Sequence, residues 1–232
     1  MISTTITSNY CKKDFHYSII GPTDISEEID VLYVQDGGDY LELGAFEKTY
    51  KNIAEKYPEA ARKWTSVLIS PGTSEERWHS YSRNGAFFQN YLSFFTNEFI
   101  PEIEKNFNSI RKRGLLGDSL GANISLNIAM QEPAKWTHLL LQSAAVSIAD
   151  LQQLQQTGSL TWNVYQTVGI YEDEFVSTIS KERLYIYTRN QELHRIFQNK
   201  HTHIEYVEKE EHHLWEFWKR NLSEALEFFV NR

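Results

Sequence analysis

Ser119 has the sequence setting of an enzymatic nucleophile. It lies in the peptide Gly117-Asp118-Ser119-Leu120-Gly121, after a short apolar run and before a stretch with helical spacing of apolar residues. A tight turn between a strand and a helix is typical of a nucleophile elbow, which presents the serine hydroxyl at the strand tip. Glycine at either end of the turn lets the strand and the helix pack closely. Because Gly and Ser are common residues, the pattern alone is weak, and its chemistry depends on partners elsewhere.

A serine hydroxyl becomes an effective nucleophile only when a base takes its proton and a further group orients that base. In folds built on such an elbow, an acid and then a histidine follow the serine along the chain. Each of them lies at the carboxyl end of a later strand. The sequence after Ser119 must therefore supply a carboxylate and a histidine at such positions.

Three carboxylates follow an expected strand at residues 162–169. Glu172, Asp173 and Glu174 come directly after the end of this strand, so they are expected at the same rim of the sheet as Ser119. Glu172 is nearest the strand tip and is the preferred acid, followed by Asp173 and then Glu174. A solvated acidic loop is the alternative interpretation of the whole run.

Two adjacent histidines occupy the position that such a fold gives to the base. His212 and His213 follow the last expected strand and precede an expected terminal helix at residues 214–230. Their spacing does not choose between them. The histidines at positions 194, 201 and 203 lie on an expected helix or strand, without a carboxylate or a glycine turn beside them, and are expected at the surface.

A metal site is the competing use of the histidines near the C-terminus. His201 and His203, with Glu210, Glu211 and the following histidine pair, offer imidazoles and carboxylates that suit zinc or manganese. The sequence has no helical His-x-x-x-His pair and no cysteine beside them that would support such a site. We therefore favour the catalytic interpretation and expect no metal.

Backbone amides at two turns are candidates for stabilising the negative charge on an attacked carbonyl. Leu120 follows the nucleophile in the first turn of the expected helix, where its N–H has no helical partner. Asp36-Gly37-Gly38-Asp39 ends an expected strand at residues 31–35, and glycine there allows a close approach of the backbone to a ligand. A plain turn accounts for these glycines equally well.

A substrate cleft near these residues has four candidate wall residues. Residues 73–84 are expected to form a long polar loop after a strand, and such loops often line binding sites. This loop carries Arg77 and Trp78. Tyr40, after the glycine turn, and Trp215, after the histidine pair, are the other two candidates.

The elements that position these residues alternate between strands and helices, which predicts a mostly parallel sheet with helices on both faces. The expected strands, besides the one that enters the elbow, cover residues 15–20, 31–35, 65–70, 138–144, 162–169, 184–187 and 203–208. The expected helices cover residues 45–55, 90–107 with a kink near Pro101, the stretch from the elbow to about 132, and residues 150–156, 190–199 and 214–230. The fold class is therefore α/β, without a large lid domain.

Composition excludes several functional classes. The chain has 232 residues and no linker-like stretch, so residues 1–232 are expected to form one domain. Its formal net charge of −8 argues against nucleic-acid binding, and the basic run at residues 111–113 is expected to be a solvated connection. Cys11 is the only cysteine, which excludes an intrachain disulfide. The N-terminus lacks the pattern of a signal peptide and no stretch approaches a membrane span, so we expect a cytoplasmic protein that does not bind membranes.

Several segments resemble the esterase-D and enterochelin-esterase-like branch of the α/β-hydrolases, which also includes mycolyltransferase-type proteins. The resemblance extends over most of the chain and rests on residues 31–37, 113–121, 142–144, 168–172 and 213–218. It implies a single-domain α/β-hydrolase fold. The base of this family is followed by one residue, a Trp, two residues and a second Trp, which matches Leu214-Trp215-Glu216-Phe217-Trp218 and selects His213 over His212.

The resemblance also implies a role for each site residue. The nucleophile, acid and base would be Ser119, Glu172 and His213, and the oxyanion donors would be the backbone N–H groups of Gly38 and Leu120. Together these residues predict a serine carboxylester hydrolase that works through an acyl-enzyme, without a metal or an organic cofactor. Its partner would be a small-molecule ester or thioester, and a homodimer stays open.

Two other functions use the same residues differently. An acyltransferase would share the triad and the acyl-enzyme but pass the acyl group to an alcohol. A catalytically silent binding module would keep the fold while Glu211 and His212 disrupt the geometry between Ser119 and His213. The identity of the acyl group cannot be deduced from residue types.

Overall fold

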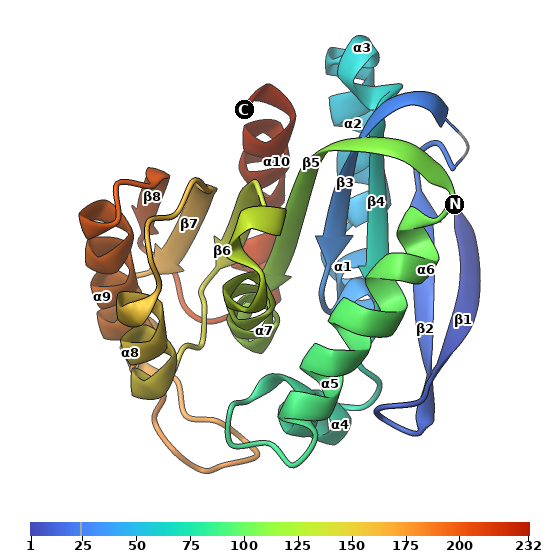
Figure 1. Ribbon diagram of the computed structural model, residues 1–232. Coiled ribbons are helices and arrows are strands. Elements are labelled where there is room, and N and C mark those ends of the chain that lie inside the picture. Colours follow the sequence, from blue (N-terminus) through green and yellow to red (C-terminus); the bar gives the residue numbers. More distant parts are fainter. Residues whose placement is uncertain (24) are drawn as a thin grey trace.

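The computed structural model describes residues 1–23 and 25–232, and the side chains of all these except residues 25–27. They form an eight-stranded sheet with helices on both faces (Figure 1). The strands are β1 (Ile2–Ser8), β2 (Lys13–Ile20), β3 (Ile25–Val34), β4 (Trp64–Ile69), β5 (Phe107–Asp118), β6 (His138–Gln142), β7 (Asn163–Gly169) and β8 (His203–Lys209). Their order in the sheet is β1-β2-β4-β3-β5-β6-β7-β8. The β1–β2 and β2–β4 pairs are antiparallel, whereas the remaining neighbours are parallel.

The helices divide between the two faces of the sheet. The α-helices are α1 (Gly37–Glu42), α2 (Phe46–Lys56), α3 (Pro58–Ala61), α4 (Ser74–Tyr81), α5 (Phe88–Phe94), α6 (Ile100–Glu104), α7 (Ser119–Gln131), α8 (Ile148–Gln156), α9 (Ile186–Asn199) and α10 (Trp215–Asn231). A π-helical turn, η1 (Phe95–Phe99), and two 3₁₀ turns, η2 (Pro133–Lys135) and η3 (Glu172–Glu174), complete the set. None of the helices in the described ranges is both long and apolar enough to cross a membrane.

Two apolar layers hold the helices to the sheet. Leu32 and Leu116 belong to a cluster with the buried side chains of α1, α2 and α10. Tyr33 and Leu115, their neighbours in sequence, belong to the cluster on the opposite face, which includes α5 to α9. Successive strand residues point to opposite faces, so a strand covered on both sides is apolar throughout. The continuous apolar runs in the sequence follow from this arrangement, and the expected α/β fold is confirmed.

The structure corrects the prediction for residues 73–84. They contain α4 rather than a continuous loop. The Thr73 hydroxyl oxygen accepts the backbone N–H of Glu76, and the Glu76 carboxylate accepts the backbone N–H of Thr73. This reciprocal pair is a capping box, and the Thr-x-x-Glu spacing was visible in the sequence. The helix fixes the direction of Arg77 and Trp78, which a loop would leave variable.

The basic run at residues 111–113 lies inside β5 and is not a solvated connection. Arg111 forms an ion pair with Asp30, and Arg113 forms one with Glu104. Lys112, on the other face of the strand, donates to the backbone carbonyl of Phe229 near the end of α10. Asp30 and Phe229 are distant along the chain, and Glu104 belongs to the preceding helix α6, so the basic run by itself could not reveal these partners.

The other elements include one wrong prediction, one confirmed prediction and two elements that were not predicted. Residues 184–187 do not form a strand: α9 begins at Ile186, and a single bridge joins Val176 to Arg183. The helix predicted around Pro101 is divided into α5, η1 and α6, in agreement with the expected kink. Strand β1 and helix α1 were not predicted; α1 begins within the glycine turn after Asp36.

His138, at the start of β6, is a buried histidine. It is 1% exposed, and its ring packs edge-on against Phe229 with 5.2 Å between ring centroids. Burial lowers the pKa of His138 from its ordinary 6.5 to about 3, and the charge of Lys112 acts in the same direction. The folded protein therefore keeps this imidazole neutral at a pH where the unfolded chain protonates it.

We predict that the free energy of unfolding decreases as the pH is lowered below 6.5. The unfolded chain binds a proton at His138 near pH 6.5 and the folded protein only near pH 3, so this residue contributes a slope of about 1 kcal/mol per pH unit between these values. Urea unfolding of the wild type and of His138→Leu at pH 7, 6 and 5 measures this slope. His201→Gln, at an exposed site, is the control and should keep it. Equal slopes in the wild type and His138→Leu would contradict the prediction.

Candidate active site

Ser119 begins α7 at the carboxyl end of β5, in a sharp elbow. Its φ is 48°, a left-handed conformation that residues other than glycine rarely adopt. The flanking glycines are required by close contacts: a Cβ on Gly117 would clash with the backbone of Gly121, and a Cβ on Gly121 would clash with the Asp36 carboxylate. The strained backbone turns the serine hydroxyl away from the sheet and into a cleft.

His213 lies within hydrogen-bond distance of this hydroxyl. Its Nε2 is 2.8 Å from the Oγ of Ser119, although the two residues are 94 positions apart in the sequence. The imidazole is almost completely buried and packs between Phe175 and Trp218, with ring centroids 4.4 Å and 4.8 Å away. These contacts limit rotation of the ring and keep Nε2 directed at the serine.

Glu172 is the carboxylate next to the other ring nitrogen of His213. It is fully buried at the start of η3, and its Oε1 lies 3.5 Å from the Nδ1 of His213. Asp173 instead accepts hydrogen bonds from the backbone N–H and the hydroxyl of Thr188, at the beginning of α9. Glu174 points toward His212, with 3.9 Å between charged atoms. Of the three candidate acids, the structure brings only Glu172 to His213.

The neighbours of His213 do not disturb the contact between His213 and Ser119. Glu211 forms an ion pair with Arg220 on α10, and the His212 ring stacks on Tyr171 with 5.0 Å between centroids. The side chain of His212 is 59% exposed. The disruption that would favour a silent binding module is therefore not present in the structure.

The two candidate oxyanion donors occupy the first turns of two helices. Leu120 is the second residue of α7 and lines the cleft beside Ser119. Gly38 lies in the first turn of α1 and borders an adjoining hollow, while the next residue, Asp39, borders both. Amides in the first turn of a helix have no helical acceptor, so they are free to bind an anion.

Arg77 contacts both Asp36, the residue before α1, and Asp118, the residue before Ser119. From α4 it donates Nε and Nη2 to the two carboxylate oxygens of Asp36, at 2.7 Å and 2.6 Å. Its Nη2 also lies 3.3 Å from the carbonyl oxygen and 3.4 Å from the Oδ2 of Asp118. Burial raises the pKa of the Asp118 carboxyl well above its usual range, and the charge of Asp36 raises it further against the opposing effect of Arg77.

The cleft around Ser119 has a volume of about 310 Å³. Three of the four predicted wall residues line it: Arg77, Trp78 and Trp215. Tyr40 does not. It is fully buried beneath the cleft, where its hydroxyl donates to the Oε1 of Gln142 and its ring packs edge-on against Trp215. The prediction for Tyr40 is wrong because α1, which the sequence analysis missed, turns this side chain inward.

The lining of the cleft combines apolar and charged side chains. The apolar ones come from the segment after β7 and from the start of α10, and they are Phe175, Ile179, Leu184 and Leu214. Asp39, Arg77 and Asp118 contribute charged groups. A cleft with such a mixed lining can hold an apolar acyl group while polar groups contact the ester.

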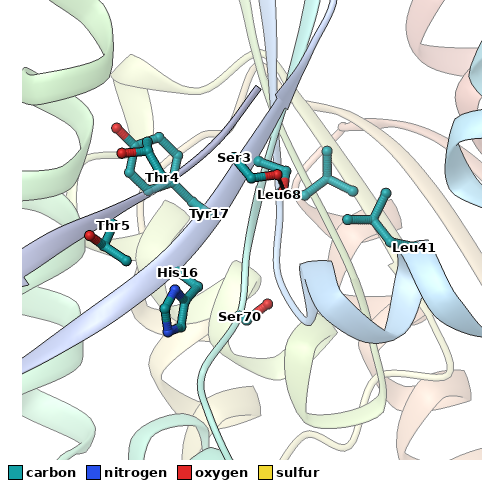
Figure 2. A pocket seen from close by; sticks show the side chains of 9 residues that line it. Ser3, Thr4, Thr5, His16, Tyr17, Leu41, Leu68 and Ser70 are labelled. Carbon is teal, nitrogen blue, oxygen red and sulfur yellow. Dashed lines mark hydrogen bonds between the residues drawn. The ribbon is translucent and has the colours of Figure 1, made fainter. Parts of the chain in front are cut away.

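A second hollow, of about 340 Å³, lies beside the antiparallel edge of the sheet (Figure 2). Hydroxyl side chains from β1 and β2 dominate its lining, and His16 and Ser70 also border it. The residues of the Ser119 cleft are not among its lining.

Among the side chains of residues 1–23 and 28–232, no three His, Cys, Asp or Glu gather as a metal ion would require. This statement includes the surroundings of His201 and His203.

The contacts of Ser143 with Glu172 and with Trp218 were not predicted from the sequence. The hydroxyl of Ser143 donates to the Oε1 of Glu172 at 2.7 Å, and it accepts the indole N–H of Trp218 at 2.9 Å. Ser143 directly follows β6, at the same rim of the sheet as Ser119 and Glu172. The position of a polar residue at a strand end was the available signal.

The sequence is similar to that of a known family and of a Bacillus subtilis protein. The sequence model of the family described as "Putative esterase" matches residues 8–229. The uncharacterized protein YjcH of Bacillus subtilis (strain 168) is 27% identical over 202 residues, which cover 84% of this chain and 82% of YjcH.

Two solved structures share the fold at low sequence identity. A ferulic acid esterase has a TM-score of 0.77 and 17% identity, covering 99% of this chain and 97% of its own. The enterobactin esterase FES from Shigella flexneri has a TM-score of 0.78 and 15% identity, covering all of this chain but only 59% of its own. The family match extends over almost the whole sequence. The chain therefore belongs to this "Putative esterase" family, and it is a carboxylic ester hydrolase.

Proposed function

We propose that the protein hydrolyses small-molecule esters through an acyl-enzyme on Ser119, with His213 as the base and Glu172 as the acid. The observation that carries this proposal is the 2.8 Å contact between His213 Nε2 and the Oγ of a serine in a left-handed elbow. A nucleophile and a base within hydrogen-bond distance are the first geometric requirement of nucleophilic catalysis.

Acylation follows from the positions of these groups. The Ser119 oxygen attacks the ester carbonyl while its proton passes to His213 Nε2, and the Glu172 carboxylate stabilises the imidazolium that forms. The N–H groups of Leu120 and Gly38, at the starts of α7 and α1, would stabilise the tetrahedral oxyanion. The intermediate collapses when the imidazolium gives its proton to the alkoxide leaving group, which departs as the alcohol.

Deacylation repeats these steps with water as the nucleophile. His213 takes a proton from the water as it attacks the acyl-enzyme, then returns this proton to Ser119 as the acid product leaves. Each step uses side chains and amides of this chain. Each oxyanion donor is expected to lower the barrier by about 3 kcal/mol, since removing one such donor in comparable enzymes costs roughly a hundredfold or more in rate.

Removal of the Ser119 hydroxyl should abolish turnover. We expect Ser119→Ala to reduce the kcat for p-nitrophenyl acetate by about 10³-fold or more and to prevent labelling by a fluorophosphonate probe. Ser74→Ala, which removes another hydroxyl from the same cleft, is the control and should change kcat by less than about twofold. Equal turnover and labelling in the wild type and Ser119→Ala would refute the proposed function.

A matched pair of variants tests the identity of the acid. Glu172→Gln removes the charge beside His213 and should lower kcat by about 10³- to 10⁴-fold. Asp173→Asn removes the neighbouring charge, which caps α9 rather than facing His213. It should change kcat by less than about threefold, although it lowers the melting temperature. A larger loss in Asp173→Asn than in Glu172→Gln would assign the acid to Asp173.

The proposed mechanism requires the elbow and the first turn of α1 to keep their relative positions, which Arg77 secures. Arg77→Met leaves the buried Asp36 carboxylate without its partner and should reduce the free energy of unfolding by about 3 kcal/mol. Arg62→Met, which breaks the exposed pair with Glu59, should cost less than about 0.5 kcal/mol. Urea unfolding measures both values, and equal costs would contradict the role of Arg77.

A further inference from the structure

We propose that Ser143 is a positioning residue that orients the Glu172 carboxylate, with the Trp218 indole fixing the direction of its hydroxyl proton. The inference rests on the proposed function, because it assigns a role next to the acid of the triad. Its basis is a continuous chain of hydrogen bonds from Trp218 through Ser143 to Glu172.

The donor and acceptor groups determine the direction of these two hydrogen bonds. An indole N–H can only donate, so the Trp218 Nε1 donates to the Ser143 oxygen at 2.9 Å. A serine hydroxyl has a single proton, and with its oxygen already accepting, that proton is available to the Oε1 of Glu172 at 2.7 Å. Glu172 therefore accepts, as an ionised carboxylate does.

The backbone of Ser143 is fixed in a position that directs its hydroxyl to Glu172. It is fully buried, and its φ of 52° lies in the left-handed region. Its backbone N–H donates to the carbonyl oxygen of Thr167 on β7 at 2.8 Å, which ties this residue to the strand that leads to Glu172. A non-glycine residue keeps such a conformation only where its surroundings enforce it.

Trp218 is fixed at its backbone as well as at its indole. The Nε2 of Gln142, the residue before Ser143, donates to the carbonyl oxygen of Trp218 at 2.9 Å, and the hydroxyl of Tyr40 donates to Gln142. The same indole packs edge-on against the His213 ring, with an interplanar angle of 83°. One side chain therefore contacts the base directly and the acid through Ser143.

Glu172 depends on this donor because its side chain is 0% exposed. A buried carboxylate needs hydrogen bonds to remain charged. Across the described part of the chain, Glu172 Oε2 has no hydrogen-bond partner, and the Nδ1 of His213 lies at 3.5 Å, beyond a short hydrogen bond. The hydroxyl of Ser143 is thus the short donor that holds the carboxylate beside His213 before the proton transfer begins.

Two variants separate the hydroxyl from the backbone. Ser143→Ala removes the hydroxyl at an unfavourable φ, and Ser143→Gly removes the hydroxyl while relieving that conformation. We expect both to lower the kcat for p-nitrophenyl acetate by about tenfold or more, because a hydrogen bond to a charged group is lost. The KM should stay within about twofold, because Ser143 does not line the cleft. If either variant keeps the wild-type kcat, Ser143 does not position Glu172.

A double-mutant cycle tests whether Ser143 acts through Glu172. In a Glu172→Ala background, Ser143→Ala should change kcat by less than about twofold, whereas an additive tenfold loss would overturn the proposal. Thermal unfolding shows whether each variant is folded. Should Glu172→Ala not fold, the cycle is measured with Glu172→Leu, which also has no acceptor for the Ser143 hydroxyl, against the same outcomes. Ser119→Ala is assayed in parallel: its inactivity keeps the proposed function intact whatever the Ser143 variants show, and its activity refutes that function independently.

Discussion

The site depends on the contact between the elbow and the start of α1. The backbone at Gly121 lies against the carboxylate of Asp36, so close that a Cβ at this position would clash with it. Arg77 neutralises that carboxylate through two hydrogen bonds and reaches Asp118, the residue before Ser119. The strained conformation of Ser119 is thus held by the close contact between the Gly121 backbone and the Asp36 carboxylate, and by the buried ion pair between Asp36 and Arg77, which opposes the cost of placing charge out of water.

A second hydrogen-bond system joins separate layers of the fold around His213 and Glu172. Tyr40 on α1 contacts Gln142 at the end of β6, and Gln142 in turn holds the backbone of Trp218 on α10. Since Trp218 packs against His213 and Ser143 contacts Glu172, movement of α1 or α10 would displace these two side chains. Residues that do not line the cleft, such as Tyr40, Gln142 and Ser143, therefore contribute to the precision of the candidate site.

Features encoded by neighbouring residues could be predicted from the sequence, whereas features that depend on distant partners could not. The elbow around Ser119 is a local pattern of glycines and apolar residues, and the order of the strands predicts the position of the His212–His213 pair, of which the resemblance to a known family selects His213. The basic residues of β5 looked solvated because Asp30 and Glu104, which pair with them, come from other elements. The capping box of α4 was an exception: Thr73 and Glu76 are close in sequence, and their local signal was overlooked.

By itself, the sequence determined the α/β architecture, the strand end that bears Ser119 and the two later strand ends that carry the carboxylates and the histidine pair. Parallel strands place their carboxyl ends at one edge, which makes these features follow from the order of elements. Only the tertiary structure decided that Glu172 rather than Asp173 faces His213, that Tyr40 lies beneath the cleft, and that Ser143 contacts Glu172. Side-chain direction at a turn depends on contacts with residues far along the chain, and those contacts exist only once the layers have packed.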